Sequence, residues 1–253
     1  MKNNTYSVII PAYNCKSTIE SSIRSALNQT YVPMEIIVID DCSTDGTWDI
    51  ITGLADRYDL IKPIRLPINS GVAVARNTAF DLSNGDFAAT LDSDDLWISD
   101  KMEKQIELMC REKCDFSCTG YRFIDLDSND MDKSYHIPEK ILYRNMLAEN
   151  YVGLSTLVIT RDIYTNYRMD SKYSHEDYAF VMTLLRDGKI GLGIDSPLML
   201  YRISQESRSG DKKKAAINRW HIYRDLLGMN IISSAAAFAK YAYRGYKKHR
   251  NLG

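Results

Sequence analysis

Short apolar runs alternate with amphipathic stretches along the first half of the chain. The apolar runs are rich in β-branched residues, as in strands buried on both faces of a sheet; they cover residues 6–10, 35–40, 60–66 and 87–91. Between them, apolar side chains recur every three or four positions, which predicts helices; these stretches are residues 17–29, 47–58, 71–83 and 101–111. The alternation predicts an α/β fold, with a mostly parallel sheet and helices on both of its faces.

The second half of the chain is less regular. We expect strands at residues 116–124, 155–160 and 198–202, and a helix at 178–186. Two further helices, at 213–227 and 231–248, are predicted to close the chain. We therefore expect an α/β domain over residues 1–202, with halves of about 1–98 and 99–202, followed by a basic helical extension over 203–253.

The distribution of charge adds to this picture. Of the 253 residues, 45% are hydrophobic and 26% are charged, as in ordinary soluble globular proteins. The net charge of −1 gives no reason to expect a nucleic-acid partner. From Arg202 onward, however, twelve basic and three acidic residues leave a net charge of +9, so the rest of the chain carries −10. We expect this tail to meet something anionic.

The five cysteines and the length of the apolar runs bear on location. The number of cysteines is odd and a strand pattern starts by Tyr6, so we expect reduced thiols in a cytoplasmic protein without a secretory leader. Cys110, Cys114 and Cys118 match no zinc or iron–sulfur spacing, which favours buried apolar cysteines over metal ligands. No run of about twenty apolar residues predicts a membrane-spanning helix, so we expect a chain that is soluble or lies on a surface.

Polar side chains follow three of the predicted parallel strands at the point where each strand ends. The first strand ends in PAYN at residues 11–14, the second in DD at 40–41, and the fourth in DSDD at 92–95. Parallel sheets bind ligands beyond the carboxyl ends of their strands, so we expect these side chains to share one crevice. Carboxylates gathered without cations repel one another, and oxygen ligands in a hydrated site suit Mg²⁺ or Mn²⁺. The sequence therefore predicts a divalent-cation site at this edge.

The segment Asp92-Ser93-Asp94 is the strongest candidate for holding that cation. In an extended segment, residues two apart point to the same side. Both carboxylates can then face one metal, or one can hold the metal and the other a sugar or ribose hydroxyl. The alternative is a strand-end turn in which Asp and Ser satisfy backbone donors. The buried strand before the segment, the third acid Asp95 and the apolar pair after it favour the metal site.

Five motifs together resemble those of the family 2 glycosyltransferases. They occur in that family's order between Ser7 and Leu185: SVIIPAYN, EIIVIDDCSTDGT, NSGVAVARNTAF, FAATLDSDD and SHEDYAF. The resemblance implies the GT-A fold and transfer of a sugar from a UDP-sugar to an acceptor hydroxyl, with inversion. It points to bacterial polysaccharide assembly of the O-antigen type, with a lipid-linked saccharide as acceptor. Residues 1–98 would then bind the nucleotide and residues 99–202 the acceptor.

The resemblance implies a set of residues that bind the donor nucleotide. They are Pro11, Ala12, Tyr13, Asp41, Asn69, Gly71, Arg76, Asp92 and Ser93. The ring of Tyr13 is expected to pack on uracil and Asp41 to accept its imide N–H. Gly71 lets the backbone approach the ligand, and Arg76 is expected to reach the uracil or the diphosphate. The alternatives are a half-buried aromatic at a strand end for Tyr13 and a solvated cation on a helix for Arg76.

The remaining motifs imply the metal ligands and the catalytic base. Asp94 is expected to bind Mn²⁺ or Mg²⁺ directly, with Asp92 on the metal or the ribose. In relatives the base is an acid of a pair that precedes a helix, which makes Asp177 the expected base, with Glu176 behind it. The alternative is that this pair only favours a helix N-terminus. The residues expected in the sugar pocket are Asp95, Trp97 and His175, with a core position as the alternative for the tryptophan.

Two roles are open for the basic tail. The helix at 231–248 combines apolar and basic residues as in a helix lying on an anionic membrane, here the cytoplasmic face of the inner membrane. The alternative is a helix packed on the α/β domain with a solvated basic side. A lipid-diphosphate acceptor would account for the positive charge, because cations attract its phosphates.

Two functions of other classes are also considered. A non-catalytic module could keep the fold and the nucleotide while serving assembly at a membrane, but the intact acids Asp41, Asp92, Asp94 and Asp177 argue against it. A phosphoacceptor receiver domain also carries paired acids at a strand end. This chain is about twice as long as such a domain needs, and its acids follow two strands, so we set that reading aside.

Overall fold

The computed structural model, which describes residues 4–203 and 212–252, is built around one mixed sheet. Its ten strands are β1 (Tyr6–Ala12), β2 (Glu35–Asp40), β3 (Ile61–Arg65), β4 (Phe87–Thr90), β5 (Leu96–Trp97), β6 (Phe116–Ile124), β7 (Asp130–Tyr135), β8 (Lys140–Ile141), β9 (Val158–Thr160) and β10 (Gly191–Arg202). Their order across the sheet is β3-β2-β1-β4-β9-β6-β10-β5, with β7 paired to β6 and β8 to β10.

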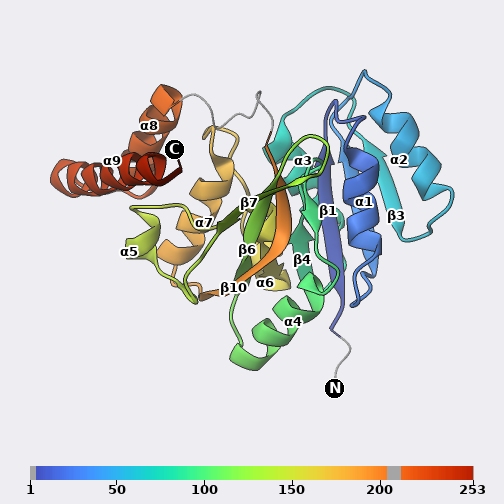
Figure 1. Ribbon diagram of the computed structural model, residues 1–253, viewed down its shortest axis with the longest axis horizontal. Coiled ribbons are helices and arrows are strands. Elements are labelled where there is room, and N and C mark those ends of the chain that lie inside the picture. The colour runs from blue at the N-terminus through green and yellow to red at the C-terminus, as the bar shows by residue number, and fades with distance from the viewer. Residues whose placement is uncertain (1–3, 204–211, 253) are drawn as a thin grey trace.

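The helices surround this sheet (Figure 1). They are α1 (Ile19–Leu27), α2 (Thr47–Ala55), α3 (Val72–Leu82), α4 (Lys101–Glu112), α5 (Tyr143–Met146), α6 (Arg161–Asn166), α7 (Glu176–Arg186), α8 (Lys212–His221) and α9 (Ile231–Leu252). A short 3₁₀ helix, η1 (Leu154–Thr156), precedes β9, and a π-helix, η3 (Ile222–Leu226), follows α8. The expected α/β sheet with helices on both faces is confirmed.

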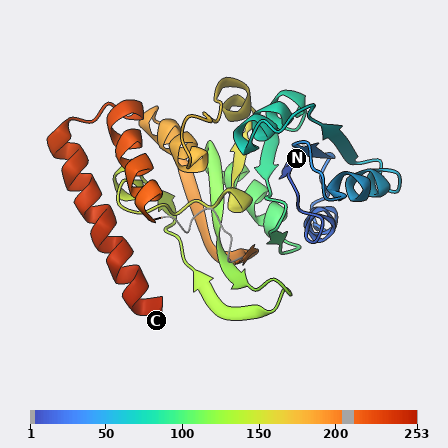
Figure 2. The same cartoon turned by 90° about the horizontal axis from the view of Figure 1, so that it is seen from above.

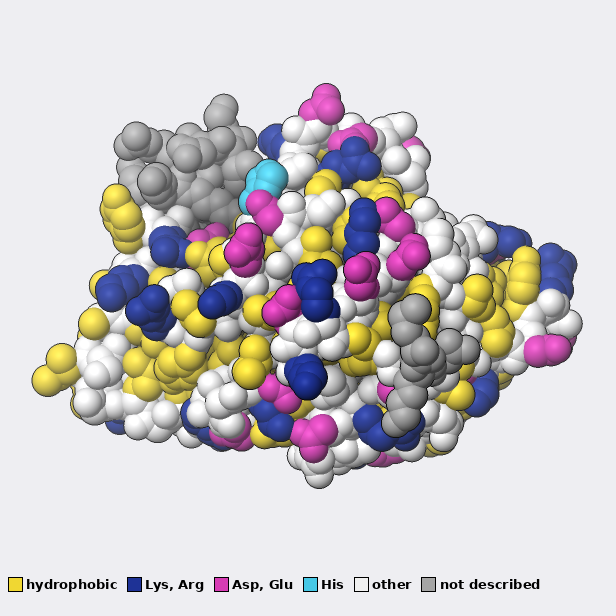
Figure 3. Space-filling model, turned by 90° about the horizontal axis from the view of Figure 1, so that it is seen from below, with side chains coloured by type: hydrophobic (Ala, Val, Ile, Leu, Met, Phe, Trp, Pro, Cys, Tyr) yellow, Lys and Arg dark blue, Asp and Glu magenta, His cyan; other side chains and the backbone are white. Residues whose placement is uncertain are grey.

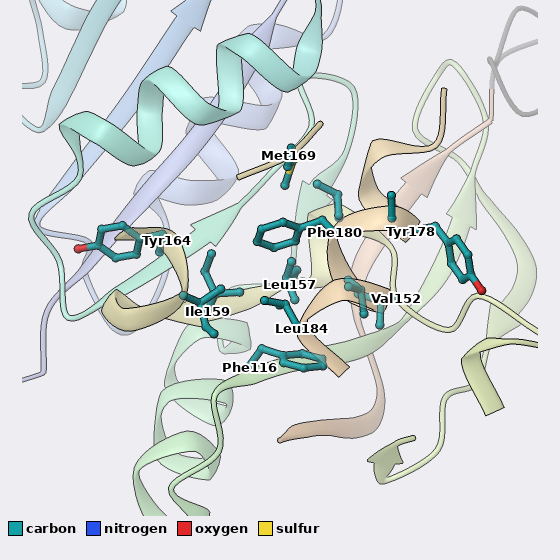
Figure 4. Packing of buried hydrophobic residues seen from close by; sticks show 14 of the residues in the cluster. Phe116, Val152, Leu157, Ile159, Tyr164, Met169, Tyr178, Phe180 and Leu184 are labelled. Atoms are coloured by element: carbon teal, nitrogen blue, oxygen red, sulfur yellow. The ribbon is translucent and has the colours of Figure 1, made fainter. Parts of the chain in front are cut away.

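Two hydrophobic cores lie on the two faces of the sheet, and β2 contributes to both. In β2, Ile36 and Val38 pack on one face with residues of α1, α2 and α4, while Ile37 and Ile39 pack on the other with residues of α3, α6 and α7. Figure 4 shows the second core, where Phe180 points from α7 toward side chains of the sheet. All four β2 residues are fully buried, and each such side chain stabilises the fold by about 1.5–3 kcal/mol. The continuous apolar run of this strand is therefore explained by burial on both faces.

The strand directions gather the strand ends that the sequence singled out. β1 pairs in parallel with β2 and with β4, and β2 pairs in parallel with β3. Just past the ends of β1 and β2, the backbone N–H of Asp41 donates to the carbonyl of Ala12 at 2.8 Å. Leu91 N–H, after β4, donates to the carbonyl of Ile9 at 2.9 Å. The polar strand ends that the sequence singled out therefore lie at the same edge of the sheet, at residues 11–14, 40–41 and 92–95.

Some elements differ from the sequence-based expectations. The strand expected at 155–160 begins as η1 and is extended only over β9, and the last strand, expected at 198–202, starts already at Gly191. A Cβ atom at Gly191 would lie 2.1 Å from the Phe116 ring, so the strand packs closely at this position. A glycine adds nothing to the hydrophobic pattern from which strands are predicted. The helix expected at residues 17–29 begins only at Ile19, and Glu20 in its first turn pairs with Arg24 at 2.8 Å.

The last helices form a separate pair beside the sheet. Figures 1 and 2 place α8 and α9 side by side at the opposite end of the molecule from α1 and α2. The rings of Trp220 and Phe238 lie edge to face across the pair at 6.0 Å. Residues 204–211, which contain part of the expected basic tail, lie outside the described residues. Within the described ranges, no helix combines the length and apolarity needed to cross a bilayer.

All five cysteines are free thiols, but their environments differ. Cys114 and Cys118 are buried, as expected for apolar cysteines, and burial raises their pKa to about 11 and about 12. Cys110 is exposed, against that expectation, because α4 turns it away from the core that Met109 enters.

Candidate functional site

The first part of the candidate site is formed by the ends of β1 and β2. Pro11 and Ala12 are buried in the strand, whereas Tyr13 is 49% exposed and its ring is accessible to a ligand. Asn14 adopts a positive φ of 46°, and its side-chain oxygen accepts the backbone N–H of Thr44 at 2.9 Å. This hydrogen bond ties the end of β1 to the loop after β2 and fixes the backbone that carries Tyr13.

Asp41 anchors the loop that leads into α3. Its two carboxylate oxygens accept the backbone N–H groups of Ser70 and Gly71, both at 2.7 Å, and the residue is only 3% exposed. Gly71 has φ 88° and ψ 158°, a backbone conformation that is essentially restricted to glycine. Both oxygens are engaged by these backbone groups, and the expected contact between Asp41 and the base stays a prediction. Asn69, just before this loop segment, is exposed.

Arg76 connects two motifs that are far apart in the sequence. Its Nη2 lies 2.5 Å from Oδ1 of Asp92, after β4, and its Nη1 lies 2.9 Å from Oε1 of Glu176, at the start of α7. Arg76 is only 3% exposed, so it is not the solvated cation on a helix that was considered from the sequence, and its expected contact with the uracil or the diphosphate stays a prediction. Burial alone would lower the pKa of Arg76, but the charges of Asp92, Glu176 and Asp177 outweigh this effect and raise it. We call Arg76, Asp92 and Glu176 the carboxylate bridge.

The acidic pair occupies the first turn of α7. Glu176 is 9% exposed and is held by Arg76, whereas Asp177 is half-buried and close enough to contribute to the charge around Arg76. The partial positive charge of a helix N-terminus stabilises carboxylates at both positions. His175 precedes the pair, and its Nδ1 lies 3.0 Å from Nδ2 of Asn218 in α8. The arrangement leaves Asp177 as the more accessible acid of the two.

Asp95 lies under the turn that the other acids of its motif form. Its carboxylate accepts the hydroxyl of Ser155 at 2.5 Å and the backbone N–H of Arg202 at 3.0 Å, and the residue is 1% exposed. Burial, followed by the nearby charges of Asp94 and Asp92, raises the pKa of Asp95 well above its usual range. A side chain enclosed in this way supports the turn from below, and its expected place in the sugar pocket stays a prediction.

Trp97 is also a supporting residue in this structure. It is 5% exposed, and its indole N–H donates to the carbonyl of Ser155 at 2.6 Å. The ammonium of Lys101, itself fully buried, lies 4.0 Å from the centre of the indole ring. The core alternative considered for Trp97 is thus the one that its burial matches.

Three residues that support the site were not found from the sequence. Ser155 contacts Asp95 and also accepts the backbone N–H of Asp92 at 3.0 Å, and Arg202 donates from Nε to the carbonyl of Asp94 at 2.8 Å. Lys101 lies below Trp97. Ser155 and Arg202 are remote from Asp92–Asp95 in the chain, and Lys101 has the appearance of a surface lysine at a helix start. Only tertiary contacts identify them.

The carboxylates at this edge fit a cation site that a ligand completes. Asp94 is exposed and Asp92 is half-buried, with Arg76 on its Oδ1. Among the described residues, no group of three or more His, Cys, Asp or Glu side chains converges as a complete metal cage. Mg²⁺-type sites commonly use one or two carboxylates together with substrate phosphates. The donor set therefore suits a cation that arrives with, or is completed by, a diphosphate.

The amino-acid sequence of this chain is similar to those of known glycosyltransferases. The sequence model of glycosyl transferase family 2 matches residues 7–178. TuaG of Bacillus subtilis (strain 168), a glycosyltransferase named for teichuronic acid biosynthesis, is 38% identical over 242 residues, which are 96% of each chain. WfgD of Escherichia coli, a UDP-Glc:alpha-D-GlcNAc-diphosphoundecaprenol beta-1,3-glucosyltransferase, is 33% identical over 250 residues, 98% of this chain and 96% of WfgD.

The fold is similar to that of a protein whose structure has been solved with a nucleotide-sugar. The structure of S. aureus TarS 1-349 in complex with UDP-GlcNAc superposes with a TM-score of 0.74 at 18% identity, covering 96% of this chain and 73% of that chain. This likeness supports the expected GT-A arrangement of the sheet and helices. The stretch that the family model matches contains every member of the carboxylate bridge and Asp177.

Proposed function

The chain belongs to glycosyl transferase family 2, and on this premise we propose that it moves a sugar from a UDP-sugar to a hydroxyl of a lipid-linked saccharide, with inversion at the anomeric carbon. WfgD, which is similar along almost its whole length, is named for a UDP-Glc donor and a diphosphoundecaprenol-linked acceptor. The observation that carries the proposal is the carboxylate bridge, because Arg76 holds Asp92 and Glu176 at opposite ends of one guanidinium. The bridge supports the proposal because its two ion pairs join the two acidic motifs to one side chain.

Asp177 is the proposed catalytic base. It takes the proton of the acceptor hydroxyl while the hydroxyl oxygen forms a bond to the anomeric carbon. The bond from that carbon to the diphosphate oxygen breaks, and UDP leaves with the electron pair. Because attack occurs on the face opposite to UDP, the configuration inverts. Glu176, whose carboxylate is engaged by Arg76 at 2.9 Å, is proposed to position α7.

The donor is proposed to lie along the strand ends. Tyr13 offers an exposed ring for the uracil, and the exposed Asn69 and the backbone around Gly71 border the nucleotide. Ser93 lies half-buried between the two acids of the D-x-D segment. A divalent cation, Mn²⁺ or Mg²⁺, would be held by Asp94 and by Oδ2 of Asp92, since Arg76 engages Oδ1. When bound, it would neutralise charge on the departing diphosphate.

A peripheral contact with an anionic membrane follows from the proposed acceptor. A lipid-linked saccharide is held at a bilayer surface, so the crevice has to approach that surface. The tail carries a net charge of +9, which favours a surface of anionic lipids. We assign this contact to α8 and α9, at the cytoplasmic face of the inner membrane.

The function is tested by replacing the proposed base. Asp177→Asn keeps the shape of the side chain but removes the proton acceptor, so kcat is expected to fall by about 10² to 10⁴. Binding of UDP, measured by calorimetry, is expected to stay unchanged, because Asp177 does not contact the nucleotide in this proposal. The assay is transfer of sugar from a panel of UDP-sugars to a lipid-linked saccharide acceptor.

Asp187→Asn is the matched control, since Asp187 is exposed at the other end of α7. This control is expected to retain full activity. A chelator arm in the same assay tests the cation, and transfer is expected to stop until Mn²⁺ or Mg²⁺ is restored. Undiminished turnover of Asp177→Asn would show that the base has been assigned to the wrong residue.

A further inference from the structure

A cationic pocket lies away from the strand ends, between α5 and α9. Its volume is about 380 Å³, room for about a dozen water molecules. It is lined by Arg144, Asn145, Ala148, Lys240, Tyr243 and Arg244. Figure 3 shows Lys and Arg side chains gathered among hydrophobic ones on the side of the molecule where α5 and α9 lie. Three cations around one hollow require an explanation, because like charges repel.

The charges of this pocket are only partly compensated within the protein. Arg244 donates to Oε2 of Glu149 at 2.8 Å and also to the hydroxyl of Tyr151. Within the described part of the chain, the side chains of Arg144 and Lys240 form neither an ion pair nor a hydrogen bond. The pocket therefore keeps a net positive charge and unused donors, which suits a ligand with several anionic oxygens.

Helix α9, which forms one wall of the pocket, presents an apolar face to solvent. Ser234 and Ala237 are buried against the protein, whereas Ile232 is 82% and Tyr243 is 68% exposed. Ala239 lies between these two at helical spacing and is also exposed. An apolar stripe beside a cationic pocket matches a molecule in which a hydrocarbon chain carries a phosphate group.

Both walls of the pocket are connected to the residue next to the proposed base. Tyr178, which follows Asp177 in α7, donates its hydroxyl to the carbonyl of Met146 in α5 at 3.0 Å. The guanidinium of Arg219 lies 3.4 Å from the centre of the Tyr178 ring and 4.6 Å from that of Tyr241 in α9. A ligand held between α5 and α9 is thus held against the elements that position Asp177.

We propose that this pocket binds the diphosphate of the lipid-linked acceptor, with the hydrocarbon chain along the exposed face of α9. Arg144 and Lys240 would contact the phosphate oxygens, and Arg244 would be shared between the ligand and Glu149. The inference rests on the proposed function for the identity of the ligand, but the pocket itself can be tested without any sugar transfer.

The test measures binding of the full chain to lipid vesicles by flotation. Three vesicle compositions are compared: phosphatidylcholine alone, phosphatidylcholine with phosphatidylglycerol, and phosphatidylcholine with polyprenyl diphosphate at the same total charge. The unaltered protein is expected to bind the diphosphate vesicles at least about tenfold more tightly than the phosphatidylglycerol vesicles. The double variant Arg144→Gln/Lys240→Gln is expected to lose this preference.

The matched control is Lys104→Gln/Arg111→Gln, which removes the same two charges from the exposed side of α4. It is expected to keep the preference for diphosphate. Equal losses of binding to both anionic compositions in the pocket variant would overturn the proposal, since they would indicate only a general attraction to charge. Unchanged binding in the pocket variant would overturn it as well.

Kinetics separate this inference from the proposed function. With a lipid-linked acceptor, the pocket variant is expected to raise KM about tenfold while kcat and UDP binding stay constant. A protein that shows the diphosphate preference and its loss in the variant, but transfers no sugar from any UDP-sugar, would support the pocket and refute the function. Sugar transfer with an unchanged KM in the pocket variant would refute the pocket alone.

Discussion

At the scale of single residues, the site depends on how buried charges are compensated. Arg76 is the clearest example, because one guanidinium neutralises Asp92 and Glu176 out of contact with most solvent. A planar guanidinium offers separate N–H groups to two carboxylates, which a lysine ammonium does less well. The residue that the sequence presented as a cation for the ligand therefore holds the two acidic motifs together.

Removing the guanidinium is expected to destabilise the protein strongly. Arg76→Met leaves the buried carboxylate of Glu176 and the half-buried carboxylate of Asp92 without their cation, so the free energy of unfolding should fall by about 3–5 kcal/mol. Sugar transfer should be lost at the same time, because Glu176 no longer fixes the start of α7. Urea denaturation followed by circular dichroism measures the first effect.

Arg24→Met serves as the comparison, since Arg24 forms an exposed pair with Glu20 four residues away and a long hydrogen bond, at 3.4 Å, to the hydroxyl of the exposed Tyr58. Such pairs contribute about 0.3–0.5 kcal/mol. Similar losses in the two variants would mean that the carboxylate bridge has no special role in stability.

Asp95 predicts a pH dependence of stability. Its pKa is raised well above the usual range by burial and then by Asp94 and Asp92, so the folded state holds a proton that the unfolded state releases above about pH 4. Between that pH and the raised pKa, stability therefore decreases as pH rises. Asp95→Asn mimics the protonated form and can still form hydrogen bonds with Ser155 and Arg202. The variant should show a flatter profile of unfolding free energy from pH 4.5 to pH 8 than the unaltered protein. A profile that keeps its slope would assign the dependence to another group.

At the scale of elements, the loop before α3 is determined by backbone geometry. Gly71 combines a positive φ with an extended ψ, and Asp41 accepts its N–H at 2.7 Å. A helix that begins in this way can bring its free N–H groups and a close backbone to the crevice. The position of Arg76, one turn further along, follows from where this loop ends.

Two glycine substitutions separate backbone strain from packing. A side chain at Gly71 or at Gly53 would meet nothing within 4 Å, so neither substitution creates a clash. Gly71→Ala should still lower the free energy of unfolding by about 1–3 kcal/mol, because its φ of 88° is unsuited to alanine. Gly53→Ala, inside α2, should raise it by about 0.5–1 kcal/mol. The same denaturation measurement decides both, and a neutral Gly71→Ala would contradict the role given to this loop.

At the scale of the whole molecule, one sheet connects the crevice to the helical tail. The tail is neither wholly packed nor wholly free: Ile222 and Tyr223 are fully buried in or beside the core, whereas most of the described side chains of α9 are exposed. Both roles considered from the sequence therefore remain compatible with α9, since one face packs and the other is open. The structure divides the tail between η3, which belongs to the core, and α9, which covers its side.

Truncation distinguishes these two parts. A chain ending at Asn230 lacks α9 but keeps Ile222 and Tyr223, so UDP binding should be unchanged and the loss of stability small. A chain ending at Ile203 also loses those two buried side chains, each of which contributes about 1.5–3 kcal/mol, and should be clearly less stable. Thermal unfolding and calorimetry with UDP measure the two effects. Loss of UDP binding on removal of α9 alone would show that the tail reaches the nucleotide site.

The sequence by itself determined the fold class and the order of the motifs. Buried parallel strands require continuous apolar runs, and β2 and β4 follow the residues predicted for them closely because burial on both faces leaves few alternatives. The acids at the strand ends could be expected to lie together because the carboxyl ends of parallel strands lie at the same edge of a sheet. Short pieces such as β5, β7, β8 and α5 were missed, since two to six residues carry too little periodicity.

Which of the candidate residues are open to solvent depends on contacts in the folded chain. Asp41 and Asp95 belong to the recognised motifs and Trp97 follows one of them, yet the three residues are 3%, 1% and 5% exposed and support the site from within. Tyr13 remains open to solvent. The physical reason is that exposure and ion pairing depend on neighbours supplied by distant segments, such as Ser155 and Arg202, whose approach no local pattern records.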